Sequence, residues 1–215
     1  MTLSLCLLFP LFSPVWSQIT YGVRGGLSYS ALIQNMENKN KVGSRAGFSI
    51  GGLIDIPFYR RFSLRPELSF VNQGGSFYSR IDNEMSAIKN KYNYYSIQLP
   101  VNIVYNIPIS GVKMSVFMGP AVDYSLFGSR TSEGVEEDLV FGDDEVGDLK
   151  KWDVGVNMGL CVKYQQVFFS INALCGGLDR RSVKHEGESR LYQNNVTFSF
   201  GYIFPQKVTE RSATK

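Results

Sequence analysis

The sequence has very little histidine, little cysteine and almost no net charge. His185 is its only histidine among 215 residues, which argues against histidine-based catalysis and against a metal site built from several histidines. The formal net charge is only +3, so the overall charge does not indicate nucleic-acid binding. No long helical stripe of apolar residues is present either. Glycine and aromatic residues are plentiful instead, with 21 Gly, 12 Tyr and 15 Phe, which favours a protein built from strands.

The chain begins with an apolar stretch, MTLSLCLLFPLFSPVWSQ, that Pro10 and Pro14 interrupt. This stretch is too short and too broken to cross a bilayer as a helix. Val15 and Ser17 stand at the −3 and −1 positions of a signal-peptidase cleavage site. We therefore expect a secretory signal peptide at 1–17, one β-barrel domain at 18–204 and a polar C-terminal tail at 205–215.

Large apolar residues alternate with small or polar residues in eight segments of the chain. In VTFSFGYIF, for example, aromatic residues occupy one face and the other face carries Thr197, Ser199 and Gly201. A period of two is typical of strands whose two faces meet different surroundings. The expected strands lie at about 19–29, 45–56, 62–73, 95–105, 112–126, 152–164, 167–175 and 196–204.

The connections between these strands alternate between short and long. Strict alternation indicates an up-and-down antiparallel meander, with tight turns at one end and long loops at the other. An even number of strands also places both termini at the short-turn end. The short connections are 57–61, 106–111 and 165–166, and the long polar ones are about 31–43, 74–91, 127–150 and 176–190.

The alternation fits two kinds of barrel. A soluble lipocalin-like barrel would turn the apolar face inward and bind a small apolar ligand, whereas a membrane barrel would turn it toward lipid. Eight strands enclose too little room for the bulky apolar set. We therefore favour an all-β fold, an eight-stranded up-and-down antiparallel transmembrane β-barrel, and keep the soluble barrel as the alternative.

The inward face of the expected barrel carries charged residues. Because buried charges require partners, we expect an ion-paired lumen formed by Arg24, Arg45, Asp55, Arg65, Glu67, Lys113, Asp123 and Lys163.

Aromatic residues gather near both ends of the expected strands. Two aromatic girdles, one at each membrane surface, are typical of transmembrane barrels. This pattern predicts a protein of the cell outer membrane that contacts its lipid, with termini in the periplasm and long loops outside the cell. The expected girdle residues are Tyr21, Tyr59, Tyr105, Tyr164, Tyr202 and Phe204 at the short-turn end, and Tyr29, Tyr94, Tyr124 and Trp152 at the long-loop end.

Two cysteines remain in the expected mature chain, Cys161 and Cys175. If residues 165–166 form a two-residue turn, Cys161 lies opposite Ser170 and Cys175 lies opposite Val156. The two cysteines are then about 16 Å apart along the strands, at about 3.3 Å per residue, and point to opposite faces. A disulfide requires Cα atoms within about 7 Å. We predict two free thiols, although exported proteins often pair their cysteines.

Two other segments could be taken for binding sites. GVRGG at 22–26 has the glycines of a phosphate loop, but no helix follows it, so strand curvature is favoured. The acidic residues of 133–148 could supply oxygen ligands to Ca²⁺, but their spacing matches no EF-hand, so a solvated loop is favoured. A base beside a nucleophile or water is also missing, since His185 stands alone in a polar segment. We predict no catalytic site, no cofactor and no metal site.

Several segments together resemble the PorT-like outer-membrane β-barrel family of Bacteroidetes. The likeness covers nearly all of residues 18–204, and SLRPELSF and SIQLPVNI are its most specific parts. It implies an integral outer-membrane barrel of eight strands. One founding member assists a protein-secretion system, so the resemblance also implies other envelope or secretion proteins as partners, but no nucleic acid. The segments are GVRGGLSYSAL, RAGFSIGGLIDIPFYRRFSLRPELSFVNQGG, NYYSIQLPVNIVYNI, FMGPAVDYSL and VTFSFGYIF.

Overall fold

The structure of the chain is a computed structural model. The expected signal peptide, the tail beyond Pro205 and His185 lie outside the residues that it describes. Among the described residues, no helix is long and apolar enough to cross a membrane. The described residues are 19–34, 43–80, 87–109, 111–142, 147–182 and 190–205.

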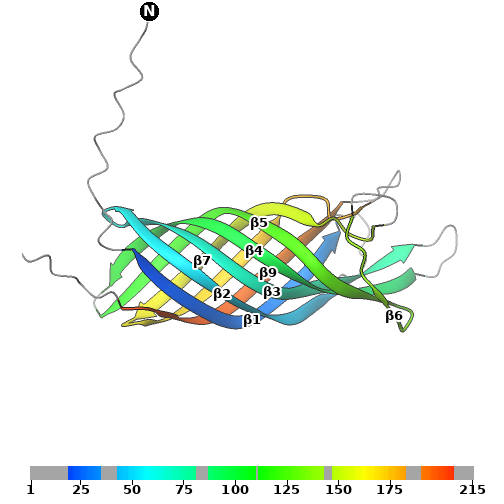
Figure 1. The fold of residues 1–215 in the computed structure, drawn as a ribbon, viewed down its shortest axis with the longest axis horizontal. Helices are drawn as coiled ribbons and strands as arrows, with labels where there is room; N and C mark the ends of the chain where they lie inside the picture. Colours follow the sequence, from blue (N-terminus) through cyan, green and yellow to red (C-terminus); the bar gives the residue numbers. More distant parts are fainter. Residues whose placement is uncertain are drawn as a thin grey trace, which may run out of the picture.

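Nine antiparallel strands form one continuous sheet that closes on itself (Figure 1). The hydrogen-bonded order is β4-β3-β2-β1-β9-β8-β7-β5, and pairing between β4 and β5 joins the two ends. Strand β6 has four residues and extends the sheet only beside the end of β5. The other eight strands form the closed barrel that the sequence predicts. The strands are β1 (Thr20–Gln34), β2 (Ser44–Tyr59), β3 (Phe62–Arg80), β4 (Ala87–Ile109), β5 (Val112–Ser132), β6 (Val135–Asp138), β7 (Trp152–Tyr164), β8 (Val167–Gly176) and β9 (Leu191–Ile203).

Several strands extend further toward the long-loop end than the alternation predicts. β3 continues to Arg80, β4 starts at Ala87 and β9 starts at Leu191. The expected loops at 74–91 and 127–150 are therefore partly strand. Both faces of these extensions carry polar residues, so the period of two that marks a half-apolar strand is missing there.

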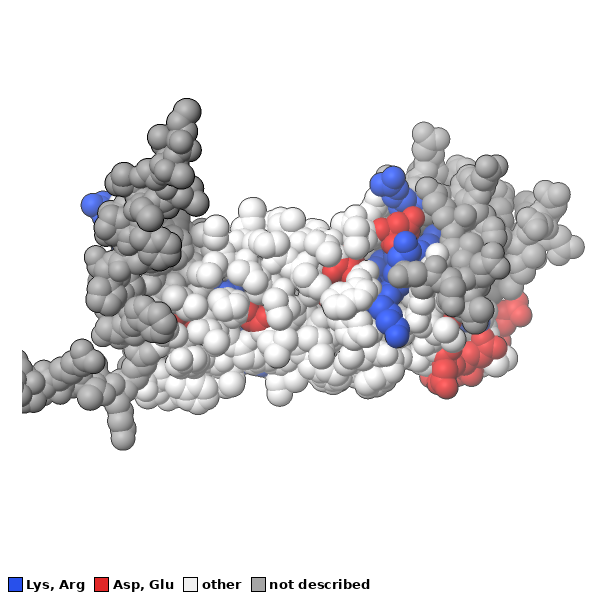
Figure 2. All heavy atoms as spheres, turned by 45° about the horizontal axis from the view of Figure 1, so that its top comes forward, with Lys and Arg blue, Asp and Glu red and all other residues white. Residues whose placement is uncertain are grey.

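The outer wall of the barrel is apolar and the lumen is polar. On β1, Val23 and Leu27 are 47% and 70% exposed, whereas Arg24 and Ser28 are buried. In Figure 2 most of the wall is white, and Lys, Arg, Asp and Glu gather toward the end that carries β6. This arrangement is the opposite of a soluble lipocalin-like barrel, whose apolar residues would line the interior.

The start of β1 and the end of β9 lie beside the tight turns. Gly22, near the start of β1, pairs with Ile203 at the end of β9 and with Leu53 on β2. The turns at 60–61 and 165–166 lie at the same end of the strands. The start of β1 and the end of β9 therefore lie at the short-turn end, as an even number of strands requires.

The glycine-rich segment GVRGG lies inside β1, and a strand rather than a helix continues from it. A Cβ atom at Gly26 would clash with the carbonyl oxygen of Phe198 on β9. Glycine therefore permits the close approach of β1 to β9 that closes the barrel.

The β7–β8 hairpin has the register that the sequence predicts. Cys161 pairs with Ser170, and Cys175 pairs with Val156. Cys161 is buried, Cys175 is exposed, and both thiols are free.

Mass spectrometry should find both thiols of the purified mature protein alkylated without reductant. The protein should first be unfolded, because Cys161 is buried in the folded barrel. A reduced sample provides the control and should give the same mass. An intramolecular bridge in the non-reduced sample would contradict the hairpin register, which keeps the two Cα atoms too far apart.

Candidate functional site

Two ion pairs lie in the lumen. Nη1 of Arg24 on β1 lies 2.9 Å from Oε2 of Glu67 on β3, and both side chains are buried. Arg65 on β3 donates from Nε and Nη2 to Oδ2 of Asp55 on β2, at 3.0 and 2.5 Å. A charge that leaves water requires a partner, and each pair provides one. The structure thus brings together four of the charged residues that the alternation places in the lumen.

Hydrogen bonds extend the Arg24–Glu67 pair across the barrel. Nη2 of Arg24 donates to Oγ of Ser69 at 3.0 Å, and Nδ2 of Asn102 donates to Oε1 of Glu67 at 3.2 Å. Nδ2 of Asn157 in turn donates to Oδ1 of Asn102 at 2.9 Å. The network therefore links β1, β3, β4 and β7 from the inside.

A second polar cluster surrounds Asp123, which is 3% exposed and lies nearer the long-loop end. Its Oδ2 accepts hydrogen bonds from Nε2 of Gln73 at 2.9 Å, Oγ of Ser96 at 3.1 Å and Nε2 of Gln98 at 2.7 Å. These three donors take the place of water around Oδ2 of the buried carboxylate, whereas Oδ1 accepts no hydrogen bond from a described residue.

Arg180 is a lumen residue that the alternation does not predict. It follows β8 in the segment expected as a loop, yet its side chain is fully buried. Its Nη2 donates to Oγ of Ser125 at 2.7 Å, and its guanidinium lies 5.6 Å from the ring centroid of Tyr94. Its charge also interacts with the buried carboxylates of Asp123 and Asp153. A single arginine in an irregular segment carries no periodic signal, so sequence reasoning had no means to find it.

The prediction that Tyr94 belongs to the long-loop girdle is wrong. Tyr94 is fully buried in the lumen, and its hydroxyl donates to Oε1 of Gln193 at 2.7 Å. The adjacent Tyr95 points to the outer wall instead and stacks on Phe70, with ring centroids 5.4 Å apart. The alternation of β4 continues through both tyrosines, so Tyr95 shares the outward face of Ile97 and Tyr94 shares the inward face of Ser96. The β4–β5 register also shifts between Tyr95 and Ser96.

Apart from Tyr94, the expected girdle residues lie on the outer wall or at its ends. At the long-loop end, the rings of Tyr124 and Trp152 are 4.5 Å apart, and Tyr29 is exposed. At the short-turn end, Tyr105 packs on Phe62. The remaining residues at that end are exposed, and they are Tyr21, Tyr59, Tyr164, Tyr202 and Phe204. Aromatic residues at both edges of an apolar wall are typical of a protein that spans a membrane.

Two apolar clusters lie in the lumen, one between the polar networks and the long-loop end and one between them and the short-turn end. The cluster toward the long-loop end includes residues from the segment after β6, which pack against inward-facing strand residues. It consists of Leu32, Tyr92, Tyr94, Leu139, Leu149 and Leu191. The cluster toward the short-turn end consists of Leu53, Val104, Phe117, Cys161, Phe168 and Ile203.

Arg130, at the long-loop end of β5, holds two acidic residues of the 133–148 segment. Its Nη2 lies 2.6 Å from Oε2 of Glu137, and its Nη1 pairs with Asp148. The hydrogen bond with Glu137 raises the pKa of Arg130 above its ordinary value.

No group of potential ligands that could hold a metal ion occurs among the described residues, although 143–146 lie outside them.

Four charges expected in the lumen form no ion pair with another described residue. Asp123 is held by the hydrogen bonds described above, and the other three lie toward the ends of the barrel. Arg45 pairs through its backbone with Ser30 at the long-loop end of the barrel. Lys113 on β5 and Lys163 on β7 are register partners at the short-turn end. The structure therefore separates these three residues from the ion-paired centre of the lumen.

The family described as "Outer membrane protein beta-barrel domain" matches residues 13–177. Among solved structures, the chain is similar to Neisserial surface protein A, with 12% identity over 87% of this chain and 99% of that chain and a TM-score of 0.49. It is also similar to the outer membrane protein OprG from Pseudomonas aeruginosa, with 10% identity, coverage of 87% and 96% and a TM-score of 0.49. For Ail of Yersinia pestis, the identity is 12%, the coverage 86% and 98% and the TM-score 0.44. No curated protein matches the sequence.

Proposed function

The chain belongs to the outer membrane protein β-barrel domain family, and on this basis we propose that it is a non-conducting integral barrel with a structural or interaction role. The observation that supports this role is a lumen filled by side chains inside an apolar wall. Ion pairs and hydrogen bonds occupy its centre, and an apolar cluster lies on either side. We assign no reaction to the lumen, because Glu67 and Asp123 are held by neighbouring donors.

We propose that the short-turn end faces the periplasm and that the long-loop end lies outside the cell. Bacterial outer-membrane barrels typically have short periplasmic turns and longer extracellular loops. The two described ends of this barrel lie beside the tight turns, and the exposed β6 hairpin lies at the other end. In this orientation both termini are periplasmic.

The resemblance to the PorT-like family supports a more specific proposal, an accessory role in protein secretion. Such a role needs contact with other envelope proteins rather than a catalytic centre. The β5–β6 hairpin offers one surface for contact, since all four residues of β6 are exposed. Lipid of the outer membrane would cover the apolar wall between the girdles.

Fractionation of cells tests the proposed location. We expect the mature chain in the outer-membrane fraction, because its outward apolar residues require lipid or detergent. After detergent extraction, an unheated sample, in which the barrel is folded, should migrate differently on a gel from a boiled sample. The boiled sample serves as the unfolded control. Recovery of the mature chain as a soluble monomer without detergent would overturn the proposal.

Planar-bilayer recordings test the closed lumen. We expect no stable nanosiemens-scale steps, because side chains of eight strands fill the centre of the lumen and an apolar cluster lies on either side of it. A wide porin inserted into the same bilayers provides the positive control. Steps of porin size from this chain would contradict a filled lumen.

A further inference from the structure

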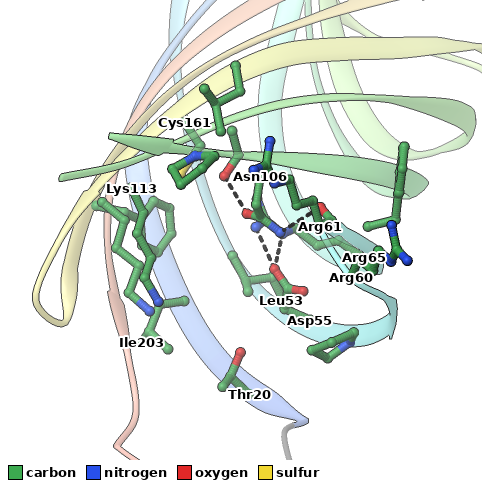
Figure 3. A pocket seen from close by; sticks show the side chains of 17 residues that line it. Thr20, Leu53, Asp55, Arg60, Arg61, Arg65, Asn106, Lys113, Cys161 and Ile203 are labelled. Carbon is green, nitrogen blue, oxygen red and sulfur yellow. Dashed lines mark hydrogen bonds and ion pairs between the residues drawn. The ribbon is translucent and has the colours of Figure 1, made fainter. Parts of the chain in front are cut away.

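The short-turn end of the barrel contains a cavity of about 510 Å³ (Figure 3). Its inner wall includes the apolar side chains of Leu53, Phe168 and Ile203, which belong to the cluster that closes this end of the lumen. Its volume lies within the range of small-molecule sites in proteins, about 300–1,000 Å³. The cavity therefore has room for more than an inorganic ion.

The charged residues around this cavity are almost all cationic. Among the described residues of the lining, five carry positive charge and one carries negative charge, so their formal net charge is five minus one, or +4. A cleft lined by charge of one sign, with walls of low dielectric constant, concentrates ions of the opposite sign. The cations are Arg60, Arg61, Arg65, Lys113 and Lys163, and the anion is Asp55.

Asp55, the one carboxylate among the described residues of the lining, already has a partner. Oδ2 of Asp55 accepts both hydrogen bonds from Arg65, at 3.0 and 2.5 Å, and Figure 3 shows this pair on the side of the cavity away from Lys113. Among the described residues, no ion pair involves Lys113 or Lys163. Neither lysine therefore has an ion-pair partner among the described residues, and both line the cavity, Lys163 half-buried and Lys113 exposed.

Lys113 and Lys163 also stand directly opposite each other. They are register partners on β5 and β7, and both line the cavity. Like charges directly opposite each other on neighbouring strands destabilise a sheet. An anion bound between them would reverse that repulsion, because each ammonium group could donate a charge-assisted hydrogen bond to it.

We propose that this cavity binds a small organic phosphate, with the phosphoryl group between Lys113 and Lys163 and the apolar part against Phe168 and Ile203. Arg60, whose guanidinium lies over the ring of Tyr59, and Arg61, which donates to the hydroxyl of Tyr105, add positive charge at this end of the barrel. The proposed orientation of the barrel implies that the ligand comes from the periplasm. The binding of the ligand does not depend on that orientation, so purified protein tests it separately.

Isothermal titration calorimetry with phenyl phosphate tests the proposal, using the refolded mature chain in zwitterionic detergent micelles at low ionic strength. We expect saturable binding of phenyl phosphate, weaker binding of inorganic phosphate and no binding of benzyl alcohol. Empty micelles provide the baseline. No saturable binding of phenyl phosphate would overturn the proposed site, and equal affinity for inorganic phosphate would overturn the role of the apolar wall.

A pair of double variants locates the site. The change K113Q/K163Q should weaken the binding of phenyl phosphate about tenfold or more, since charge-assisted hydrogen bonds are lost. The change K150Q/K151Q removes the same charge directly before β7, near the long-loop end, and should leave the affinity within about twofold. Heat-modifiable migration confirms that both variants fold. Equal weakening in both variants would overturn the assignment, because it would indicate a general effect of net charge.

Discussion

Replacing Glu67 by alanine is expected to lower the free energy of unfolding of the barrel by about 3–5 kcal/mol. The substitution leaves the guanidinium of Arg24 buried without its carboxylate partner, which lies 2.9 Å away in the intact protein. It also removes the acceptor of the hydrogen bond from Asn102. Reversible urea unfolding in lipid vesicles, followed by the fluorescence of Trp152, measures the effect.

Two further variants show whether the loss comes from an uncompensated charge. The double variant R24M/E67M removes both charges and should recover most of the lost stability, because an apolar pair of similar size can replace a buried ion pair. Glu136→Ala changes an exposed glutamate of β6 and should stay within about 0.5 kcal/mol of the unchanged protein. If Glu67→Ala cost no more than Glu136→Ala, the lumen would be open to water, which the proposed closed barrel does not allow.

The alternation of residue types predicts the barrel because the two faces of each strand meet different surroundings. A shift of one residue would expose Arg24 and Arg65 on the apolar wall, so the pattern fixes which face is inside. The two-residue turn then fixes the β7–β8 register, in which Cys161 meets Ser170. The eight strands of the barrel, their direction and the inward position of Arg24, Arg65, Glu67 and Asp123 could be derived in this way.

The partners of the inward charges could not be derived from the same pattern. Arg24 pairs with Glu67 on β3 rather than with a residue of a neighbouring strand, so the contact depends on how the closed wall curves. Arg180 enters the lumen from an irregular segment, where no periodicity exists. Tyr94, by contrast, lies on the inward face with Ser96 and Gln98, so the same period of two continued past Tyr95 places its ring in the lumen. The contacts of Arg24 and Arg180 depend on tertiary geometry rather than on local sequence.

Replacing Met158 by arginine is expected to lower the free energy of unfolding in lipid vesicles by about 2–4 kcal/mol. Met158 lies midway along β7, between the girdle residues Trp152 and Tyr164, and it is 38% exposed on the outer wall. Its partner on β5, Met118, is also exposed. A guanidinium at this position would lie near the middle of the hydrocarbon, far from either membrane surface. Urea unfolding of the refolded variant measures the cost.

The same change at Val135 separates a lipid-facing wall from a water-facing one. Val135 on β6 is 62% exposed, more than Met158, but it lies in the hairpin beyond the long-loop girdle. In water, the arginine would be tolerated at both positions with a cost within about 0.5 kcal/mol, since neither position is buried. In a membrane, only Met158→Arg should be costly, because only that side chain is surrounded by lipid. Equal and small costs for the two variants in vesicles would contradict the membrane-spanning wall, whereas a large cost confined to Met158→Arg requires it.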